Sequence, residues 1–221
     1  MQLSEIEQTR LWAQTANRLR ARHLLPQHGA SLSLRIPGAD AMWFGAAGAG
    51  ATGADATDHG APLRIGINTH AVGEAMLHAA IYRTRPDVGA IAVGGGAYGN
   101  LLAGFGGRMT GLFDEQVRHL GRMPPPAASG ELPPGLREGG NAFLQGGVPV
   151  CLGTTASRLA MNAELFEKCA KAYVLAAASG ERIKALPWLV RFIANGRLRK
   201  DQRRATERFA AGLFAEESRG Y

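Results

Sequence analysis

The sequence predicts a layered α/β protein, and three kinds of segment support this prediction. Short segments either alternate apolar and polar side chains or run continuously apolar, which is typical of strands. Longer segments between them carry apolar side chains at helical spacing. Turns rich in glycine and proline separate the two kinds. Strands that alternate with helices along one chain favour a sheet covered by helices.

The first helix is expected to begin at a capping box. Ser4 closes the helix end and Glu7, three residues on, reaches back to it. Trp12 and Leu19 share one face, which we expect to be buried. The helix stops before Pro26 because the residue before a proline disfavours the helical conformation.

Residues 31–36 alternate strictly and predict a half-buried strand. One face carries Leu32, Leu34 and Ile36, and the other carries Ser31, Ser33 and Arg35. A turn is expected at residues 37–40, where proline, glycine and aspartate cluster.

The middle of the chain predicts three more strands and a helix. One strand begins at 42–44, a short one spans 63–67, and the apolar run 88–93 reads as a buried strand. Thr69 can cap a helix that runs to about Thr84. The side chains expected to face the core from this helix are Val72, Met76, Leu77, Ala80 and Ile81.

The last part of the chain predicts a loop, a strand and two helical segments. Residues 123–140 are rich in proline and glycine and predict a surface loop. A strand is expected over 142–152, interrupted by Gly146-Gly147 and Pro149. A long helix is expected over 157–178.

The remainder, 181–221, looks helical and basic. We therefore expect a main domain over 1–180 and a basic helical extension over 181–221.

Composition narrows the class of protein. The chain has 221 residues, 46% of them hydrophobic, so it can bury a sizeable core. No run of eighteen apolar residues occurs, so no membrane-spanning helix is expected. The polar N-terminus argues against a secretory signal, and Cys151 and Cys169 are expected to be buried free thiols. These features predict a cytoplasmic protein.

The glycines after the apolar run 88–93 admit a dinucleotide-binding interpretation. Gly94, Gly96 and Gly99 spell G-x-G-x-x-G, and Asp114 follows at the spacing of the ribose-binding acid. The helix that should hold the pyrophosphate is short, however, because glycines recur at 104, 106 and 107. This interpretation therefore stays an alternative.

Four segments, taken in order, resemble one known family. They are "ASLSLR" (30–35), "GEAMLHAAIYRTRPDVGAI" (73–91), "AYGNLLA" (97–103) and "AELFEKCAKAYVLAAASG" (163–180). The second is similar to S-E-x-x-L-H-x-x-I-Y-x-x-R-P-D-V-x-A-V of the class II aldolase/adducin family. The first lies where the family has G-N-(I/L)-S-x-R, and the fourth resembles its L-E-x-x-A-K helix. The resemblance spans roughly residues 5–180.

The resemblance implies a three-layer α/β/α domain around a mostly antiparallel sheet. It also implies a homo-oligomer, usually a tetramer, with active sites between subunits. The family's enzymes cleave, epimerise or dehydrate small hydroxy-carbonyl compounds, often phosphorylated. Three histidines, from an H-T-H and an N-H-G, hold a divalent metal that polarises a carbonyl. A glutamate in S-S-E acts as acid and base.

This chain departs from the family at its metal ligands. Val93-Gly94-Gly95 stands where H-T-H belongs, and Gln145-Gly146-Gly147 stands for N-H-G, with the following spacing one residue off. Valine and glycine offer no side-chain donor, so we expect no family-type zinc site and no cofactor. Ser31 replaces the family asparagine, and Val72-Gly73 replaces its serine pair.

The family positions that remain define the predicted site. Glu74 is the candidate catalytic acid/base, and its alternative is a solvated helix glutamate. The predicted substrate-binding residues are Ser31, Ser33, Arg35, Gly73, Gly94, Gly95, Tyr98 and Gln145. For Ser31, Ser33 and Arg35 the alternative is a solvent-facing strand side. The resulting prediction is a pseudoenzyme with a binding or assembly role. A metal-independent lyase, isomerase or dehydratase that uses Glu74 is the alternative.

Two further patterns remain open. His70, Glu74 and His78 lie four residues apart, which suggests a relocated metal site, although i and i+8 are about 12 Å apart along a helix. In the C-terminal segment, an apolar stripe of Trp188, Leu189, Phe192 and Ile193 accompanies many basic residues. We expect that stripe to pack on a neighbouring subunit, with an acidic membrane surface or nucleic acid as alternatives. We expect no nucleic-acid partner.

Overall fold

The computed structural model describes residues 3–26, 29–47, 61–69, 71–180 and 183–217. Within them, six strands form one sheet in the order β3-β2-β1-β4-β6-β5, and every neighbouring pair is antiparallel. The strands are β1 (Ser31–Ile36), β2 (Ala41–Ala46), β3 (Leu63–Gly66), β4 (Ala90–Val93), β5 (Ala142–Gln145) and β6 (Val148–Gly153).

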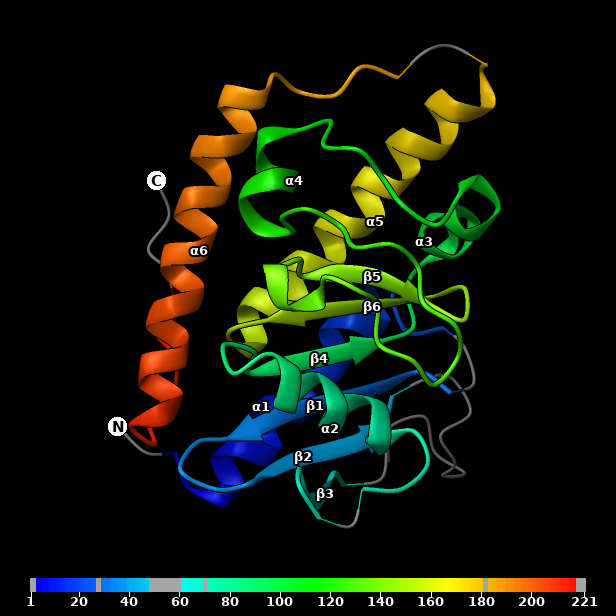
Figure 1. Cartoon of the computed structure of the whole chain (residues 1–221). Coiled ribbons are helices and arrows are strands. Elements are labelled where there is room, and N and C mark those ends of the chain that lie inside the picture. Colours follow the sequence, from blue (N-terminus) through cyan, green and yellow to red (C-terminus); the bar gives the residue numbers. More distant parts are fainter. Residues whose placement is uncertain (1–2, 27–28, 48–60, 70, 181–182, 218–221) are drawn as a thin grey trace.

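Helices cover both faces of this sheet (Figure 1). Two long helices, α1 (Glu5–Ala21) and α5 (Ala156–Ala178), pack on one face, and α2 (Ala75–Thr84) packs on the other. The remaining elements are α3 (Ala97–Leu101), η1 (Leu102–Phe105), α4 (Asp114–His119), η2 (Leu136–Glu138) and α6 (Trp188–Ala210).

Two apolar cores, one on each face, hold the layers together. The larger joins Trp12 of α1 and Phe166 of α5 to sheet residues such as Leu32. The smaller joins Tyr82 of α2 to sheet residues such as Phe143. Burying this apolar surface is the main force that holds the layers together. The three-layer arrangement and the antiparallel sheet confirm the predicted fold class.

The start of α1 is the capping box that the sequence predicts. The Glu7 backbone N–H donates to Ser4 Oγ at 3.3 Å, and the Ser4 N–H donates to the Glu7 carboxylate at 2.7 Å. Trp12 and Leu19 are buried, as expected. Indole Nε1 of Trp12 donates to the backbone oxygen of Leu32 at 3.0 Å, which fixes α1 on β1.

The helix predicted from Thr69 begins later and turns a different face inward. α2 starts at Ala75, because Gly73 has a φ of +56°, outside the right-handed helical region. Val72 and Met76 were expected in the core, but they are 74% and 58% exposed. Ile81 is buried as expected. The buried face of α2 is formed by Ala75, His78, Ala79, Ile81 and Tyr82.

The strand at 31–36 is buried on both faces over most of its length. β1 lies between β2 and β4, and α2 covers the face that carries its serines. Ser31 and Ser33 are 1% and 0% exposed, so the alternative of a solvent-facing strand side is wrong at these two positions. Their hydroxyl groups find partners on α2 instead of water.

The run 142–152, expected as one interrupted strand, is a hairpin. β5 and β6 pair antiparallel, with Gln145 opposite Val148. Gly146 and Gly147 form the two-residue turn and have φ values of +56° and +83°. Such a turn requires positive φ at both positions, which explains the two glycines physically.

The dinucleotide-binding alternative is wrong. That fold needs a parallel sheet and a helix that begins at the glycine turn. Here β4 pairs antiparallel with both neighbours, and α3 has five residues. The backbone N–H groups of Tyr98 and Gly99, where a phosphate would bind, donate to the Glu167 carboxylate at 2.8 and 2.9 Å.

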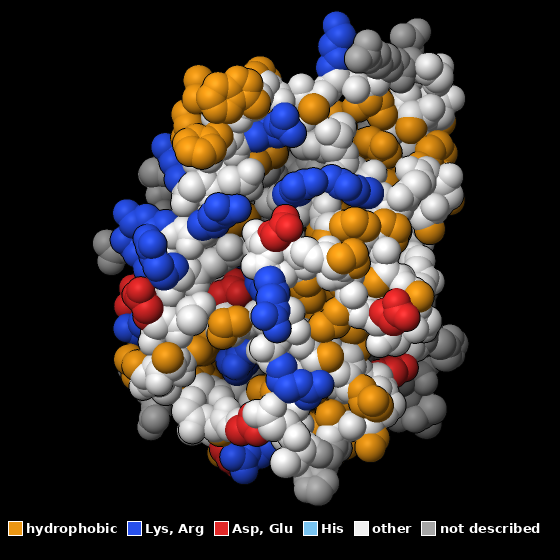
Figure 2. Space-filling model, in the orientation of Figure 1, with side chains coloured by type: hydrophobic (Ala, Val, Ile, Leu, Met, Phe, Trp, Pro, Cys, Tyr) orange, Lys and Arg blue, Asp and Glu red, His pale blue; other side chains and the backbone are white. Residues whose placement is uncertain are grey.

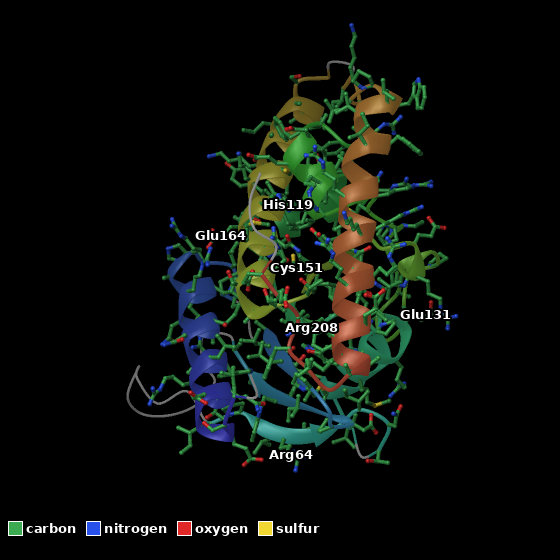
Figure 3. All side chains as sticks on the ribbon, turned by 90° about the vertical axis from the view of Figure 1, so that its left-hand side faces the viewer. Arg64, His119, Glu131, Cys151, Glu164 and Arg208 are labelled. Atoms are coloured by element: carbon green, nitrogen blue, oxygen red, sulfur yellow. The ribbon has the colours of Figure 1, made fainter. Side chains whose placement is uncertain are left out.

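α6 runs along the side of the molecule and packs mainly on α4 (Figure 1). Ala194, Leu198, Gln202 and Ala205 form its buried side. The boundary at residue 180 stays a prediction. Cys151 and Cys169 are buried free thiols, and Figure 3 shows Cys151 inside the molecule. None of the helices in the described residues is both long and apolar enough to cross a membrane.

Candidate functional site

A hollow of about 680 Å³ opens beside the N-terminal end of α2. Its walls come from the loop before α2, the first residue of β1, the last residue of β4, the last residue of β5 and the segment around Ser129. Because three strands and a helix converge here, the hollow is set by the sheet itself rather than by one loop.

Four of the predicted site residues line this hollow: Ser31, Gly73, Glu74 and Gln145. They come from separate parts of the chain, and the fold brings them together as the resemblance implies. Val93, which stands at the first metal-ligand position, also lines it. The other five predicted residues do not: Ser33, Arg35, Gly94, Gly95 and Tyr98.

Glu74 precedes the first turn of α2 and its side chain is exposed. Its Oε1 lies 3.4 Å from the place where a side chain on Gly29 would begin, so a larger residue at 29 would crowd the carboxylate. It is the only acidic residue among the described residues of the hollow. Arg83 also lines the hollow and carries a positive charge. Its Nη1 donates a hydrogen bond to the Ile67 backbone oxygen at 2.6 Å.

A buried hydrogen-bond relay leads inward from Ser31. Ser31 Oγ lies 2.9 Å from His78 Nε2, and His78 Nδ1 lies 2.7 Å from Ser33 Oγ. Ser33 Oγ in turn lies 2.9 Å from the Tyr82 hydroxyl. Because His78 and Tyr82 are four residues apart on α2, both reach the same face of β1. Only Ser31 of this relay touches the hollow.

The relay is electrically neutral. Burial lowers the pKa of His78 to about 3 because the charged imidazolium is poorly solvated there. Burial also raises the pKa of the Tyr82 hydroxyl. A serine beside a histidine resembles a nucleophile and its base, but the partner on Nδ1 here is another hydroxyl rather than a carboxylate. The arrangement therefore positions the Ser31 hydroxyl as a hydrogen-bonding group.

Arg35 anchors the opposite end of β1. Its Nε donates to the Val88 oxygen at 2.8 Å and its Nη2 to the Tyr82 oxygen at 2.9 Å. The guanidinium also lies over the rings of Tyr82 and Phe209, at 4.6 and 5.4 Å from their centroids. Since these contacts use its donors within the fold, Arg35 ties α2 and α6 to the sheet.

Gly94 and Gly95 lie where a side chain has no space. A Cβ on Gly95 would come within 2.4 Å of Pro149 Cγ, and one on Gly94 within 2.9 Å of Leu25 Cδ2. Their N–H groups donate to the Pro149 and Leu24 oxygens at 2.9 and 2.7 Å. Residues 94 and 95 thus pack against neighbouring segments rather than opening to the hollow.

Tyr98 starts α3 on the α5 side of the sheet. Its side chain is half-buried against the larger core, and Lys171 Nζ lies 5.4 Å from its ring centroid. It is therefore separate from the hollow, as are Gly94 and Gly95.

The side chains at the hollow do not fit the zinc site that the fold family implies. Zinc needs three or four nitrogen, sulfur or carboxylate donors. Val93 has none, position 95 has no room for one, and position 146 is part of a tight turn. No group of three His, Cys, Asp or Glu side chains with metal-binding geometry occurs among the described residues.

The alternative metal site at His70, Glu74 and His78 lies partly outside the described residues, because His70 is not among them. His78 has both ring nitrogens at hydrogen-bond distance from serine hydroxyls. A metal ligand needs one nitrogen free for the ion, so His78 could bind a metal only if the relay were broken.

A second hollow, of about 610 Å³, lies between α6 and the main body. His119 and Arg208 line it from opposite sides (Figure 3). Burial, then the nearby Arg158 and Arg118, lower the pKa of His119 to about 4. Arg118 pairs with Asp201 at 2.7 Å across this hollow. Both acidic and basic side chains line its walls, so its charge favours neither an anion nor a cation.

Comparison with solved structures identifies the fold. An L-fuculose 1-phosphate aldolase superposes with a TM-score of 0.72 at 18% identity, covering 90% of this chain and 98% of that one. YgbL from Klebsiella pneumoniae gives 0.68 at 18% identity, covering 87% and 99%. An aldolase II superfamily protein from Pseudomonas syringae gives 0.65 at 13% identity, covering 98% of each chain. No protein-family model and no curated protein matches the sequence.

The chain therefore has the fold of the class II aldolase superfamily, over nearly the full length of the matched structures. The fold that the sequence resemblance implies is confirmed. At these identities the likeness concerns the fold alone.

Sequence reasoning did not find the relay that orients Ser31. The sequence offers His78 as a possible metal ligand, and it assigns no role to Tyr82. The signal was present in the sequence: His78 and Tyr82 lie four apart on a helix, opposite a strand with serines at alternate positions.

Proposed function

We propose that this protein is a class II aldolase-like pseudoenzyme, which keeps the family's pocket for binding a small ligand but not its zinc chemistry. The observation that carries the proposal is the state of the metal-ligand positions. Val93 presents a hydrocarbon side chain to the hollow, and Pro149 occupies the space a side chain at 95 would need. Position 95 thus has no space for a metal-binding side chain and position 93 carries no donor, while the hollow beside them stays open.

The ligand chemistry follows from the walls of the hollow. Ser31, Gln145 and Arg83 offer hydrogen-bonding groups, while Met76 and Leu132 supply apolar surface. A few polar groups beside apolar walls suit a small hydroxy-carbonyl compound, the class that the fold family handles. Gln145 is held in place because its Nε2 donates to the Glu131 oxygen at 2.9 Å.

Assembly into a cytoplasmic homo-oligomer is part of the proposal, and the family resemblance suggests a tetramer. Val72, Met76 and Leu63 are 74%, 58% and 67% exposed. Val72 and Met76 lie at or beside the hollow, on the loop before α2 and its first turn. Apolar side chains so exposed favour a covering surface, and a second copy there would place the ligand between subunits.

A metal-independent lyase, isomerase or dehydratase remains the second candidate. It is favoured by the position of Glu74, whose carboxylate lies in the hollow with Ser31. In such an enzyme Glu74 would take a proton from, or give one to, a carbon or oxygen of the bound compound.

Metal analysis of protein purified without chelator tests the central claim. We expect no stoichiometric zinc or other transition ion in the purified protein. A full equivalent of zinc would overturn the proposal. The variant His70→Ala would then show whether that ion depends on a histidine that is not among the described residues.

A thermal-shift screen against hydroxy acids, sugar phosphates and other hydroxy-carbonyl compounds tests the binding role. We expect stabilisation that Ser31→Ala weakens and that Glu5→Gln, an exposed change on α1, leaves unaltered. No stabilisation by any member of the class would count against the binding role.

If turnover is found and Glu74→Gln leaves that turnover unchanged, the second candidate function is wrong.

A further inference from the structure

The N-terminal end of α6 exposes a compact apolar cluster, which we call the α6 tip. Trp188, Leu189, Phe192 and Ile193 form it, and they are 70%, 52%, 71% and 53% exposed. The rings of Trp188 and Phe192 lie 6.5 Å apart, one helical turn from each other. Figure 2 shows apolar side chains gathered at the upper left, over this end of the helix. Four large apolar side chains so exposed in one place are unusual for a surface that meets only water.

The same outer face of α6 becomes cationic beyond the tip. Arg199, Lys200, Arg203 and Arg204 are exposed and follow at i, i+4 spacing, and Arg204 also borders the hollow between α6 and the main body. They face away from Leu198 and Ala205, which pack on the body. Within the described residues, none of these four side chains makes an ion pair. Figure 2 shows basic side chains below the apolar cluster along the helix.

A hollow of about 350 Å³ lies beside the α6 tip, and arginines dominate its polar lining. Arg108, Arg122 and Arg191 line it, and no acidic residue is among the described lining residues. Outside the hollow, Arg122 Nη1 lies 4.0 Å from the Glu138 carboxylate. Three guanidinium groups around one small hollow form a natural seat for a phosphate group.

We propose that the α6 tip docks on an anionic phospholipid surface. The tip would enter the boundary between headgroups and acyl chains, the arginine hollow would take a headgroup phosphate, and the basic outer face would lie on the headgroups. A helix with Trp, Phe and Leu beside many Lys and Arg residues has the composition of interfacial membrane-binding helices. This proposal uses a different face from the ligand hollow and is independent of the proposed function.

Charge distinguishes a lipid surface from a second copy of the chain. In a symmetric contact between two α6 tips, Arg191 and the basic outer face would meet their own like charges. An anionic surface is complementary to the same charges. The sequence alone favours a neighbouring subunit, because it does not show where these charges lie around the tip.

Nucleic acid fits the apolar part poorly. Trp188 and Phe192 could stack on bases, but the branched side chains of Leu189 and Ile193 have no flat face with which to stack. Hydrocarbon accepts all four side chains of the tip equally well. An apolar tip that includes aliphatic side chains and is surrounded by basic residues therefore favours lipid.

Trp188 provides an internal probe for the experiment. The other two tryptophans, Trp12 and Trp43, are 1% and 8% exposed, so lipid should alter the emission of Trp188 alone. Vesicles of phosphatidylcholine with phosphatidylserine should shift its emission to shorter wavelength, and lipids brominated on their acyl chains should quench it. Trp188→Phe should abolish both signals without preventing binding.

Co-sedimentation with the same vesicles measures the affinity. Phe192→Ser with Ile193→Ser should remove most binding, and Ile6→Ser is the matched control because Ile6 is also 71% exposed. Arg199→Gln, Lys200→Gln and Arg203→Gln together should lower the partition coefficient roughly a hundredfold, because each basic residue near an anionic surface contributes about fivefold. Pure phosphatidylcholine and high salt should both weaken binding.

Failure to bind phosphatidylserine vesicles would overturn the proposal, provided that circular dichroism shows folded protein. Trp188 emission that is already at short wavelength without lipid, together with a dimer that Phe192→Ser disrupts, would assign the tip to a second copy instead. Tighter binding to a double-stranded DNA fragment than to the vesicles would also overturn it.

Discussion

The carboxylate of Glu167 accepts a hydrogen bond from the backbone N–H of Tyr98, at 2.8 Å. A second bond, from Gly99 at 2.9 Å, goes to its other oxygen. These N–H groups have no partner inside α3 because they belong to its first turn. Glu167 thus supplies from α5 the anion that stabilises the start of α3, and it fastens the chain after β4 onto the long helix.

Glu167→Ala is expected to lower the free energy of unfolding by about 2 kcal/mol, because hydrogen bonds to a charged acceptor are lost and two N–H groups are left without it. Urea denaturation measures this change. Glu164→Ala is the matched control: Glu164 lies on the same helix and pairs with Arg18 at the surface, at 2.8 Å (Figure 3). That variant should cost less than about 1 kcal/mol. Equal effects of the two variants would contradict the assigned role.

The buried pair Arg85–Asp87 should be essential to the smaller core. Two arginine nitrogens donate to the two Asp87 oxygens, both at 2.7 Å, and Arg85 also donates to the Gly140 oxygen at 2.7 Å. Asp87→Ala leaves the guanidinium buried without its counter-charge, which should cost about 3–5 kcal/mol. Arg85→Met with Asp87→Ala should cost less than the sum of the single changes. Additive single effects in urea denaturation would show that the pair is not coupled.

Two glycines offer a direct test of the closed metal position. Gly95→Ala should destabilise the fold by roughly 2 kcal/mol or more, because Pro149 blocks its Cβ and its φ of +91° strains any L side chain. Gly104→Ala meets nothing within 4 Å and should be neutral or slightly stabilising. Differential scanning calorimetry compares the two variants. A neutral Gly95→Ala would mean that position 95 can still accept a side chain.

Acid should destabilise the protein through its buried histidines. The pKa values of His78 and His119 are lowered to about 3 and about 4, so the unfolded chain takes up these protons at higher pH than the folded one. Their stability contribution is therefore complete above the ordinary histidine pKa and is lost as pH falls toward the lowered values. For His78 the slope approaches about 1.4 kcal/mol per pH unit.

Urea midpoints followed from about pH 7 to pH 4.5 check this loss. His119→Gln should reduce the slope, because it removes a group whose pKa the fold lowers. Nitrogen NMR shifts should show His78 neutral through the whole range. A His78 ring that titrates near its ordinary pKa would contradict the neutral relay.

Local sequence patterns predicted the elements well where one side of a segment meets the core. The capping box at Ser4 and the long helix that becomes α5 are examples, since each depends on nearby residues alone. The start of α2 could not be predicted in this way. Val72 and Met76 are apolar but exposed, and their helical spacing is the same as that of a stripe that faces the core.

The sequence predicted which residues of the candidate site lie at the hollow in some cases, but it did not predict the contacts that the other residues make. Resemblance located Glu74, Ser31 and Gln145, which the fold does bring to one hollow. The partners of Ser33 and Arg35 depend on how α2 and α6 pack against the sheet, and no local pattern contains that information. Polar side chains at alternate positions are typical of a solvent-exposed strand face. Polar side chains that are buried with hydrogen-bond partners give the same sequence pattern, so the two cases cannot be told apart from sequence.

The Gly146-Gly147 turn also bears on the order in which the sheet assembles. β5 and β6 are joined by two residues, so their pairing closes a very short loop. β4 must instead find Val150 and its neighbours across a long intervening chain, at a much greater entropic cost. The hairpin is thus the segment of the sheet best placed to form early. Gly146 and Gly147, which bind no metal, would then speed folding, because the early hairpin gives β4 a formed strand edge with which to pair.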